Sequence, residues 1–365
     1  MNIAIDARCL EGNKTGVGRY LGNIIQNFPN SEKDTNLQLY CTVDFSLTAD
    51  VNLQKKIVKG HPLLWKQFLV PLHQLIDKPD VFFVPSYSTP IFNPIPTVVT
   101  IHDLIFTKFP EWTDRKQRWR FKNIVTRSAK YASKIIAVSE STRKDIINLT
   151  DVKSEKVEVV YEGIDSKFEV LSKSRAIKLI KNLDIQSDFI LYVGSMHPRR
   201  NLHRLLHAFK GILHKGMNNY KLMLCGLNLY TKSDVNNWID ELGLKDYVRI
   251  LGYVTEEELL GLYNMATVFV YPSLYEGFGL PILESMACGT PVLTSNVSAI
   301  PEVAADAALL VDPYSIDELS SGLQSLLKSE KLRKEFIERG HARKQLFSWE
   351  NTAKQTSEIL KSVVR

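Results

Sequence analysis

Short apolar runs rich in β-branched residues alternate with amphipathic helical stretches along the whole chain. Such runs, bounded by glycine, proline or polar residues, are typical of buried strands in a parallel sheet. Repeated strand–helix alternation favours parallel sheets with helices on both faces. The pattern predicts strands at 2–7, 37–43, 81–85, 97–101, 135–139, 157–161, 189–193, 221–225, 248–251, 266–271, 292–295 and 309–311.

A polar, lysine-rich segment at 168–187 separates two such series of strands. The sequence therefore predicts an α/β protein with two Rossmann-like domains, residues 1–167 and 168–346. Residues 347–365 follow the second domain and are predicted to end in a helix. A chain of 365 residues is long enough for two domains that each bury a core of their own.

Composition is ordinary for a globular protein, with 44% hydrophobic and 24% charged residues. No apolar run approaches the roughly 18 residues of a membrane span, and the start MNIAIDARCL does not resemble a signal peptide. Four scattered cysteines indicate reduced thiols in a cytoplasmic protein. The net charge of +6 suits anionic substrates or an anionic membrane surface and does not by itself indicate nucleic acid.

Residues 271–295 predict a strand, a glycine-rich turn, a short helix and a second strand. Pro281 suits the first turn of a helix, and Gly289 suits its end. A helix N-terminus offers free N–H groups to phosphates or sugar hydroxyls. Glu276 lies in the turn and Glu284 eight residues later, so two carboxylates can face one ligand. The alternative is that Glu276 only interacts with the dipole at the helix N-terminus and that Glu284 is a solvated residue of the helix.

Three other strand ends carry candidate groups. Gly16 and Gly18 open a helix through about 28, where a ligand can approach the backbone, although a plain turn has the same pattern. His102 follows a predicted strand and could donate to a phosphate or hydroxyl, although lone histidines are more often structural. Arg199 and Arg200 stand at the start of a helix. Their planar guanidinium groups suit bidentate binding of a phosphate, and the alternative is that both are ordinary surface charges.

Two stretches of the first domain could form surfaces. Residues 114–134 predict a helix with Trp119 and eight cations. This helix could be an ordinary solvated face, a surface for the acceptor or for anionic lipid through residues 115–134, or a surface for nucleic acid. We rank lipid or acceptor above nucleic acid, because no nucleic-acid motif accompanies the charges. Residues 63–76 predict a core helix broken near Pro71, and the alternative is a surface for a lipid-linked acceptor.

The run from Glu276 to Glu284, EGFGLPILE, followed by SMACGTPV, resembles the E-x7-E region of the family 4 retaining glycosyltransferases. The TGVGRY opening, the His102-Asp103 pair and the PRRN turn extend the resemblance over nearly the whole chain. It implies the GT-B fold, with two Rossmann-like domains facing a central cleft and a C-terminal helix that crosses back onto the first domain.

The resemblance also implies roles for individual residues. His102 and Glu276 would be catalytic, with His102 on the sugar or its phosphate and Glu276 beside the transferred sugar. Glu284 would bind the ribose, and the segment with Tyr253 would pack on the base. The donor-binding set is Gly16, Gly18, Ser195, Arg199, Arg200, Tyr253, Glu276, Gly277, Phe278, Gly279, Leu280 and Glu284.

The chain departs from the family pattern at three positions. Glu162 stands where the family usually has Asn, Ser195 where it commonly has Arg, and Arg200 where it commonly has Lys. Arg200 can replace the lysine charge. The assignment of individual phosphate contacts therefore stays open.

The resemblance predicts transfer of a hexose from a nucleoside diphosphate sugar to a glycan or lipid-linked glycan, with retention and without a metal. Arginines and a helix dipole can stabilise the leaving diphosphate, and no DxD pair stands in a suitable loop. GDP-mannose is the first donor expected, and a UDP-sugar is the alternative. A nucleotide-sugar epimerase and a non-catalytic scaffold on the same fold are less favoured. The enzyme would work in the cytoplasm, at the inner face of the membrane.

Overall fold

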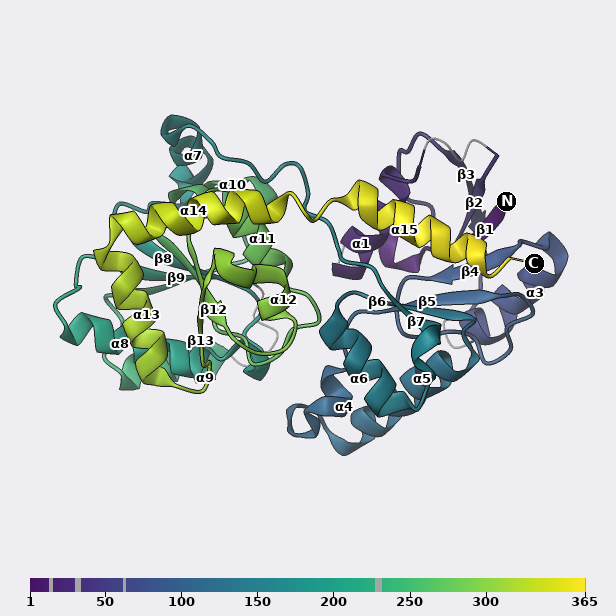
Figure 1. Cartoon of the computed structure of the whole chain (residues 1–365), viewed down its shortest axis with the longest axis horizontal. Coiled ribbons are helices and arrows are strands. Elements are labelled where there is room, and N and C mark those ends of the chain that lie inside the picture. The colour runs from purple at the N-terminus through teal and green to yellow at the C-terminus, as the bar shows by residue number, and fades with distance from the viewer. Residues whose placement is uncertain (13–15, 30–33, 62–63, 227–231, 365) are drawn as a thin grey trace. The chain divides into compact units, whose positions relative to one another are not determined.

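The computed structural model describes residues 1–12, 16–29, 34–61, 64–226 and 232–364. Within these residues the chain forms two compact units (Figure 1). Unit 1 comprises Met1–Gly163 and Phe347–Arg365, and unit 2 comprises Ile164–Leu346. The boundary follows Gly163, whereas the sequence placed it after Lys167.

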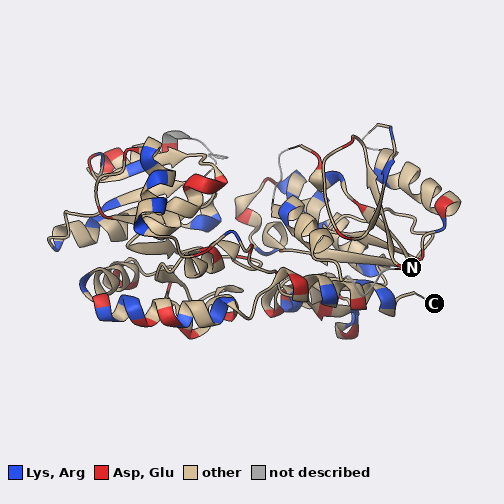
Figure 2. Cartoon of the chain, turned by 90° about the horizontal axis from the view of Figure 1, so that it is seen from above, with Lys and Arg blue, Asp and Glu red and all other residues tan. Residues whose placement is uncertain are grey.

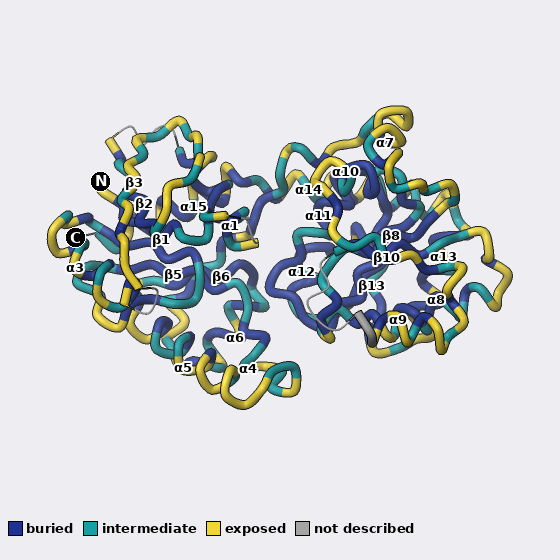
Figure 3. The backbone as a smooth tube through the Cα atoms, turned by 180° about the vertical axis from the view of Figure 1, so that it is seen from behind, coloured by how far each residue is buried: buried dark blue, intermediate teal, exposed yellow. Residues whose placement is uncertain are grey.

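The described part of unit 1 contains a seven-stranded parallel sheet in the order β3-β2-β1-β4-β5-β6-β7. Most of these strands are apolar runs buried on both sides (Figure 3). Their bounds are β1 (Asn2–Asp6), β2 (Asn36–Cys41), β3 (Asn52–Ile57), β4 (Val81–Val84), β5 (Thr97–Ile101), β6 (Lys134–Ala137) and β7 (Val157–Val159).

Strand β3 was missed by the sequence analysis. Its residues, NLQKKI, are largely exposed and carry two lysines, and it pairs with β2 at the edge of the sheet. Polar, lysine-bearing edge strands are common because they discourage pairing with other chains. They lack the apolar run by which a buried strand is recognised in a sequence.

Helices cover both faces of the unit 1 sheet. Neighbouring residues of β1, Ile3 and Ala4, belong to separate buried clusters on opposite sides. The cluster around Ile3 includes Trp349 and Leu360 of the C-terminal helix, which packs beside α1. The helices of unit 1 are α1 (Gly16–Gln26), α3 (Val70–Asp77), α4 (Ile105–Lys108), α5 (Arg115–Tyr131), α6 (Glu140–Thr150) and α15 (Trp349–Ser362).

The C-terminal helix returns to unit 1, as the resemblance implied. A Cβ added at Gly163 would lie 2.2 Å from the backbone nitrogen of Trp349, so the two segments meet backbone to backbone. The hydroxyl of Thr352 donates to the carbonyl of Tyr161 at 2.7 Å.

The described part of unit 2 contains a six-stranded parallel sheet in the order β10-β9-β8-β11-β12-β13. Its strands are β8 (Phe189–Val193), β9 (Lys221–Cys225), β10 (Val248–Gly252), β11 (Val268–Tyr271), β12 (Val292–Ser295) and β13 (Leu309–Val311). Its helices are α7 (Lys173–Ile180), α8 (Leu202–His214), α9 (Lys232–Glu241), α10 (Glu256–Met265), α11 (Leu280–Ala287), α12 (Ile300–Ala304), α13 (Ile316–Lys328) and α14 (Glu330–Lys344).

The stretch 63–76 differs from the core helix that the sequence favoured. A π-helical turn, Trp65–Leu69, leads into α3, with Pro71 in the first turn of the latter. Trp65 and Val70 are fully buried, whereas Phe68 is 66% exposed and Ile76 is 67% exposed. The core-helix prediction is therefore wrong for the outer side of this stretch. No helix in the described part of the chain is both long and apolar enough to span a membrane.

Candidate functional site

The central stretch of unit 2 folds as predicted: strand β11, a loop, helix α11 and strand β12. Gly279 precedes the helix with φ of +122°, and Pro281 follows in its first turn. Gly289, with φ of +73°, follows the C-cap residue Cys288. Positive φ is strained for residues with a Cβ, so these glycines allow the sharp turns at both ends of the helix.

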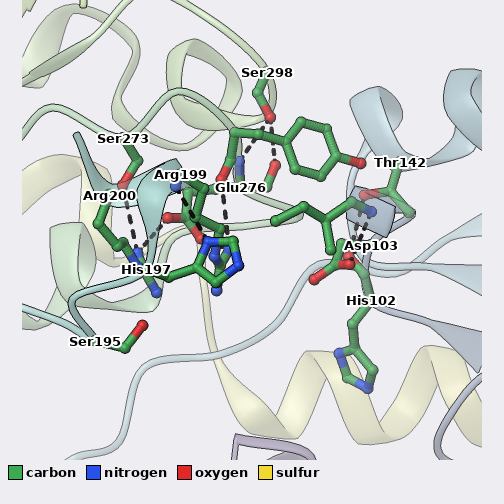
Figure 4. A network of polar contacts seen from close by, with 12 residues as sticks. His102, Asp103, Thr142, Ser195, His197, Arg199, Arg200, Ser273, Glu276 and Ser298 are labelled. Atoms are coloured by element: carbon green, nitrogen blue, oxygen red, sulfur yellow. Dashed lines mark hydrogen bonds and ion pairs between the residues drawn. The ribbon is translucent and has the colours of Figure 1, made fainter. Parts of the chain in front are cut away.

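Glu276 lies in the loop before α11 and is only 5% exposed. Its Oε2 accepts from Nη1 of Arg199 at 2.8 Å, and its Oε1 accepts from Nη1 of Arg200 (Figure 4). Its backbone N–H donates to the hydroxyl of Ser298 at 3.0 Å. One buried carboxylate is therefore shared by the two arginines that the sequence proposed for phosphate binding.

The two arginines occupy a short 3-10 helix, Pro198–Arg200, directly after β8. The backbone N–H of Arg199 donates to Nδ1 of His197 at 3.2 Å. Burial, together with the charges of Arg199 and Arg200, lowers the pKa of His197 to about 4. His197 is therefore neutral at pH 7, and the sequence analysis gave it no role.

Asn201 fixes the next turn, with φ of +62°. Its side-chain amide donates to the carbonyls of Pro272 at 3.1 Å and Pro313 at 2.6 Å. The loop after β8 is thereby tied to the loop after β11.

The arginine–glutamate network carries an excess of positive charge, because two guanidinium groups share one carboxylate. Arg200 lies over the ring of Tyr271, 4.9 Å from its centroid. Its buried Nε has no hydrogen-bond partner among the described residues. A buried donor without an acceptor is costly, and an incoming anion would supply one.

Sheet topology shows where this network lies. Strand β8 is followed in the chain by β9 on one side of it in the sheet, whereas β11 pairs on its other side. Open α/β sheets bind ligands at the carboxyl ends of strands where the strand order reverses in this way. The arginines follow β8 and Glu276 follows β11, so the network spans the switch point.

Glu284 lies inside α11 and is 4% exposed. It accepts a hydrogen bond from the hydroxyl of Tyr263 on α10 at 2.9 Å. Glu284 was predicted from the sequence but Tyr263 was not, because Tyr263 lies 21 residues before Glu284 in the chain.

The remaining candidates of unit 2 lie at neighbouring strand ends. The carbonyl of Ser195, after β8, accepts from the hydroxyl of Tyr192 at 2.9 Å. Tyr253 follows β10 and is 73% exposed. Gly226, directly after β9, lies against the backbone of Gly194: a Cβ built on Gly226 would lie 2.1 Å from the carbonyl oxygen of Gly194. Gly277, Phe278 and Leu280 belong to the loop and first residue of α11.

In unit 1, His102 follows β5 and both of its ring nitrogens have partners. Nδ1 lies 3.0 Å from Oε1 of Glu162, and Nε2 lies 2.9 Å from the carbonyl oxygen of Pro85. Burial lowers the pKa of His102, but Glu162, the carbonyl of Pro85 and the charge of Asp103 together outweigh burial, so the pKa of His102 is raised.

Helix α1 brings its own residues to the same strand end. Gly16 opens the helix, and a Cβ built on it would meet nothing within 4 Å. Gly18 is buried, and the ring of Tyr20 makes an edge contact with His102 at 4.7 Å between centroids. Thr15, the first residue of the TGVGRY motif, lies outside the described residues.

Two protein families match successive parts of the chain. The family described as Glycosyltransferase Family 4 matches residues 16–168, and the one described as Glycosyl transferases group 1 matches residues 174–343. O-antigen chain mannosyltransferase B of Escherichia coli is 30% identical over 362 residues, which cover 94% of each protein. The chain belongs to glycosyltransferase family 4.

Two further proteins place this glycosyltransferase among its relatives. The serotype-specific mannosyltransferase WbdA of Escherichia coli is 29% identical over 292 residues, which cover 75% of this chain but only 36% of WbdA. The crystal structure of HepE from Anabaena, in complex with UDP and glucose, superposes with a TM-score of 0.78 at 19% identity, covering 99% of this chain and 100% of HepE. The glycosyltransferase therefore has the GT-B fold.

The glycosyltransferase has a second charged cluster, which the sequence analysis missed. Asp6, at the end of β1, accepts from Arg8 at 2.9 Å and forms an ion pair with Lys66 at 2.9 Å. Burial raises the pKa of Asp6, but Lys66 and Arg8 outweigh burial and hold it well below its usual range. Lys66 also donates to the carbonyl of Ser88, after β4, at 2.7 Å. The cluster joins β1 to β4, where the strand order of unit 1 reverses.

Helix α5 of the glycosyltransferase carries seven of the eight cations predicted for it, whereas the eighth, Lys134, begins β6 and pairs with Glu158 at 2.7 Å. Asp114 caps the helix by accepting from the backbone N–H groups of Lys116 and Gln117, each at 2.9 Å. Trp119 is 70% exposed among its cations. No acidic residue occurs within α5, whereas α14 carries both acidic and basic residues (Figure 2).

The described residues of the glycosyltransferase contain no group of three His, Cys, Asp or Glu side chains that could hold a metal ion. The four cysteines are free thiols, as the sequence predicted.

Proposed function

We propose that this glycosyltransferase moves mannose from GDP-mannose to a hydroxyl of a glycan or lipid-linked glycan, with retention of the anomeric configuration. The observation that carries the proposal is the Arg199–Arg200–Glu276 network at the switch point of unit 2. Mannose is favoured because the relatives that match most of the chain are mannosyltransferases. The first acceptor to test is a lipid-linked O-antigen chain, because the relative that matches nearly the whole chain is an O-antigen chain mannosyltransferase.

The diphosphate is the group that the arginines would hold. A guanidinium has five N–H donors, and bidentate arginine–phosphate pairs are among the strong charge-assisted hydrogen bonds. Donor binding would draw Arg199 and Arg200 toward the phosphates and release Glu276 toward the sugar. The charge that develops on the leaving diphosphate would then meet fixed cations and the N-terminus of α11, without a metal.

The nucleoside would be held by Glu284, whose carboxylate can accept from two vicinal ribose hydroxyls. Tyr263 fixes one side of that carboxylate. The exposed ring of Tyr253 would cover the base. Ser195 and the loop Gly277–Leu280 would offer backbone groups to the phosphates and the sugar.

We expect His102 and the glycines Gly16 and Gly18 to contact the sugar or its β-phosphate. The acceptor would bind near Asp6, Arg8 and Lys66, because this cluster of charges occupies the switch point of unit 1. A hydroxyl of the acceptor would attack on the face from which the diphosphate leaves.

A thermal-shift screen against GDP, UDP, dTDP, ADP and their sugars, with and without EDTA, tests the donor and the metal. A ligand that binds only the folded protein raises its melting temperature. We expect the largest shift from GDP-mannose, unchanged by EDTA. A shift with a UDP-sugar alone would replace the donor and keep the reaction class. No shift with any nucleotide would favour a scaffold.

Turnover then separates the remaining alternatives. NMR of the product made from GDP-mannose should show the α-linkage of the donor preserved. An inverted product would refute retention. Conversion of the nucleotide sugar without any acceptor, to a second nucleotide sugar, would indicate an epimerase.

We also propose that α5 holds the enzyme at the inner face of the membrane through anionic lipids. Two hydrogen bonds hold three segments next to one another: Ile91 N–H to Gln67 Oε1 at 2.8 Å, and Thr89 N–H to Ser128 Oγ at 3.0 Å between two fully buried residues. Large apolar side chains stand exposed on each segment: Phe68, Ile91, Phe92 and Trp119. Each cation near an anionic surface adds about 1 kcal/mol.

Vesicle flotation tests this surface. Binding to vesicles with phosphatidylglycerol should exceed binding to pure phosphatidylcholine and should fall when Arg115 and Lys116 are replaced by Ala. The matched control removes Lys334 and Lys331 from the mixed-charge helix α14 and should keep binding. Equal binding of both vesicle types, or equal loss in the control, would contradict the proposal.

A further inference from the structure

The ring of His102 lies between a carbonyl oxygen and a carboxylate, and an ionised carboxylate, like a carbonyl, only accepts hydrogen bonds. The carbonyl of Pro85 faces Nε2 at 2.9 Å, and the carboxylate of Glu162 faces Nδ1 at 3.0 Å. A neutral imidazole has a single N–H and can satisfy only one of them. The imidazolium, with two N–H groups, satisfies both. The geometry therefore favours the protonated ring.

The other groups around the ring do not oppose this charge. Asp103 adds a second negative charge, which also raises the pKa of His102. Tyr20 contacts the ring as a neutral phenol, because burial raises its own pKa further. The hydroxyl of Thr142 donates to the backbone carbonyl of His102 at 3.3 Å (Figure 4). Glu162 is 7% exposed, so the charge that faces Nδ1 is largely shielded from water.

Resting on the proposed function, we propose that Glu162 is a positioning residue that keeps His102 an imidazolium at neutral pH. His102 then acts on the donor as a fixed cation, which stabilises negative charge on the β-phosphate, and it cannot serve as a proton acceptor. An amide at position 162 could donate its own N–H to Nδ1 and leave the ring neutral. The carboxylate in this chain removes that option.

The first test is an NMR titration of the histidine ring protons in the whole protein. His102→Gln identifies the His102 signal among the 8 histidines. In the unchanged protein this signal should titrate above the ordinary value of about 6.5. Glu162→Gln should lower the midpoint by about one pH unit or more, because burial then acts without the carboxylate. Glu162→Asp should retain most of the elevation.

Thr142→Val is the matched control, because it removes a contact of His102 without changing any charge. It should leave the midpoint within a few tenths of a unit. A midpoint at or below the ordinary value in the unchanged protein would overturn the inference, and this result does not depend on how any variant folds. An equal shift in Thr142→Val and Glu162→Gln would overturn it as well.

The second test follows turnover of GDP-mannose against pH. In Glu162→Gln the fall of kcat on the alkaline side should move to lower pH, whereas KM for the donor should change less. If only the proposed function is wrong, the titration midpoint of His102 will still be high, but the protein will neither bind nor turn over GDP-mannose. A raised midpoint with an unmoved rate profile would overturn the role of the charge on the donor.

Discussion

Removing the charge of Glu276 should destabilise unit 2 and at the same time free the arginines for phosphate. Glu276→Gln keeps the shape of the side chain and leaves the guanidinium groups of Arg199 and Arg200 without a counter-charge. Removing one partner of a buried ion pair costs about 3–5 kcal/mol. The amide oxygen can still accept one hydrogen bond, so we expect the lower end of that range.

The melting temperature gives the magnitude. For a domain of this size each kcal/mol corresponds to about 2–4 °C, so about 3 kcal/mol predicts a fall of about 6–12 °C. GDP should recover part of the loss, because its diphosphate can take the place of the carboxylate. A tenfold gain in GDP affinity is worth about 1.4 kcal/mol and hence about 3–6 °C of additional stabilisation by GDP. Transfer should be lost, because Glu276 no longer holds the sugar.

Glu330→Gln is the matched control for the stability measurement. Glu330 pairs with Lys334 at 2.8 Å, but both side chains are 70% exposed, so the same substitution should leave the melting temperature nearly unchanged. The reasoning is refuted if both variants melt within about 2 °C of the unchanged protein. Equal stabilisation of the Glu276→Gln variant and the unchanged protein by GDP would show that the carboxylate does not compete with phosphate.

Three further predictions concern single residues. Tyr263→Phe removes the hydroxyl that holds Glu284. Because one hydrogen bond is worth roughly 1 kcal/mol, calorimetry should show a fall in GDP affinity of about 5–10-fold. An unchanged affinity would argue against Glu284 as the residue that binds the ribose. Gly16→Ala meets no atom within 4 Å, so the melting temperature should stay the same while the donor affinity falls; equal affinity would remove the loop from the donor site. His197 has a pKa of about 4 in the folded protein, against about 6.5 for an ordinary histidine. Below about pH 6.5 the unfolded chain therefore binds a proton on His197 that the folded chain does not, and the free energy of unfolding should decline toward pH 4. In urea titrations at pH 7 and pH 5, His197→Asn, which keeps a cap acceptor, should lose less stability than the unchanged protein, and an equal loss would assign the acid sensitivity to other groups.

Much of the fold could be predicted from the sequence because the parallel strands are buried on both faces. Such strands are short apolar runs, which stand out from the amphipathic helices between them. The turn before α11 was also predictable, since Gly279 can adopt the positive φ that residues with a Cβ resist, and the ring of Pro281 fixes its own φ. The E-x7-E motif identified the family without any knowledge of contacts. Strand β3 escaped because an exposed edge has no apolar signature.

Only the tertiary structure decided which charges meet. Glu276 lies more than seventy positions from Arg199 and Arg200, and Glu162 lies 60 positions from His102, so no local pattern links them. The sequence assigned the arginines to phosphate and the glutamate to sugar, and the folded chain pairs them with one another. These pairs arise because parallel strands deliver their carboxyl ends to one edge of a sheet, whatever their separation in the chain. Local propensities determined the strands and helices, and the order of the strands in each sheet determined the chemistry at their ends.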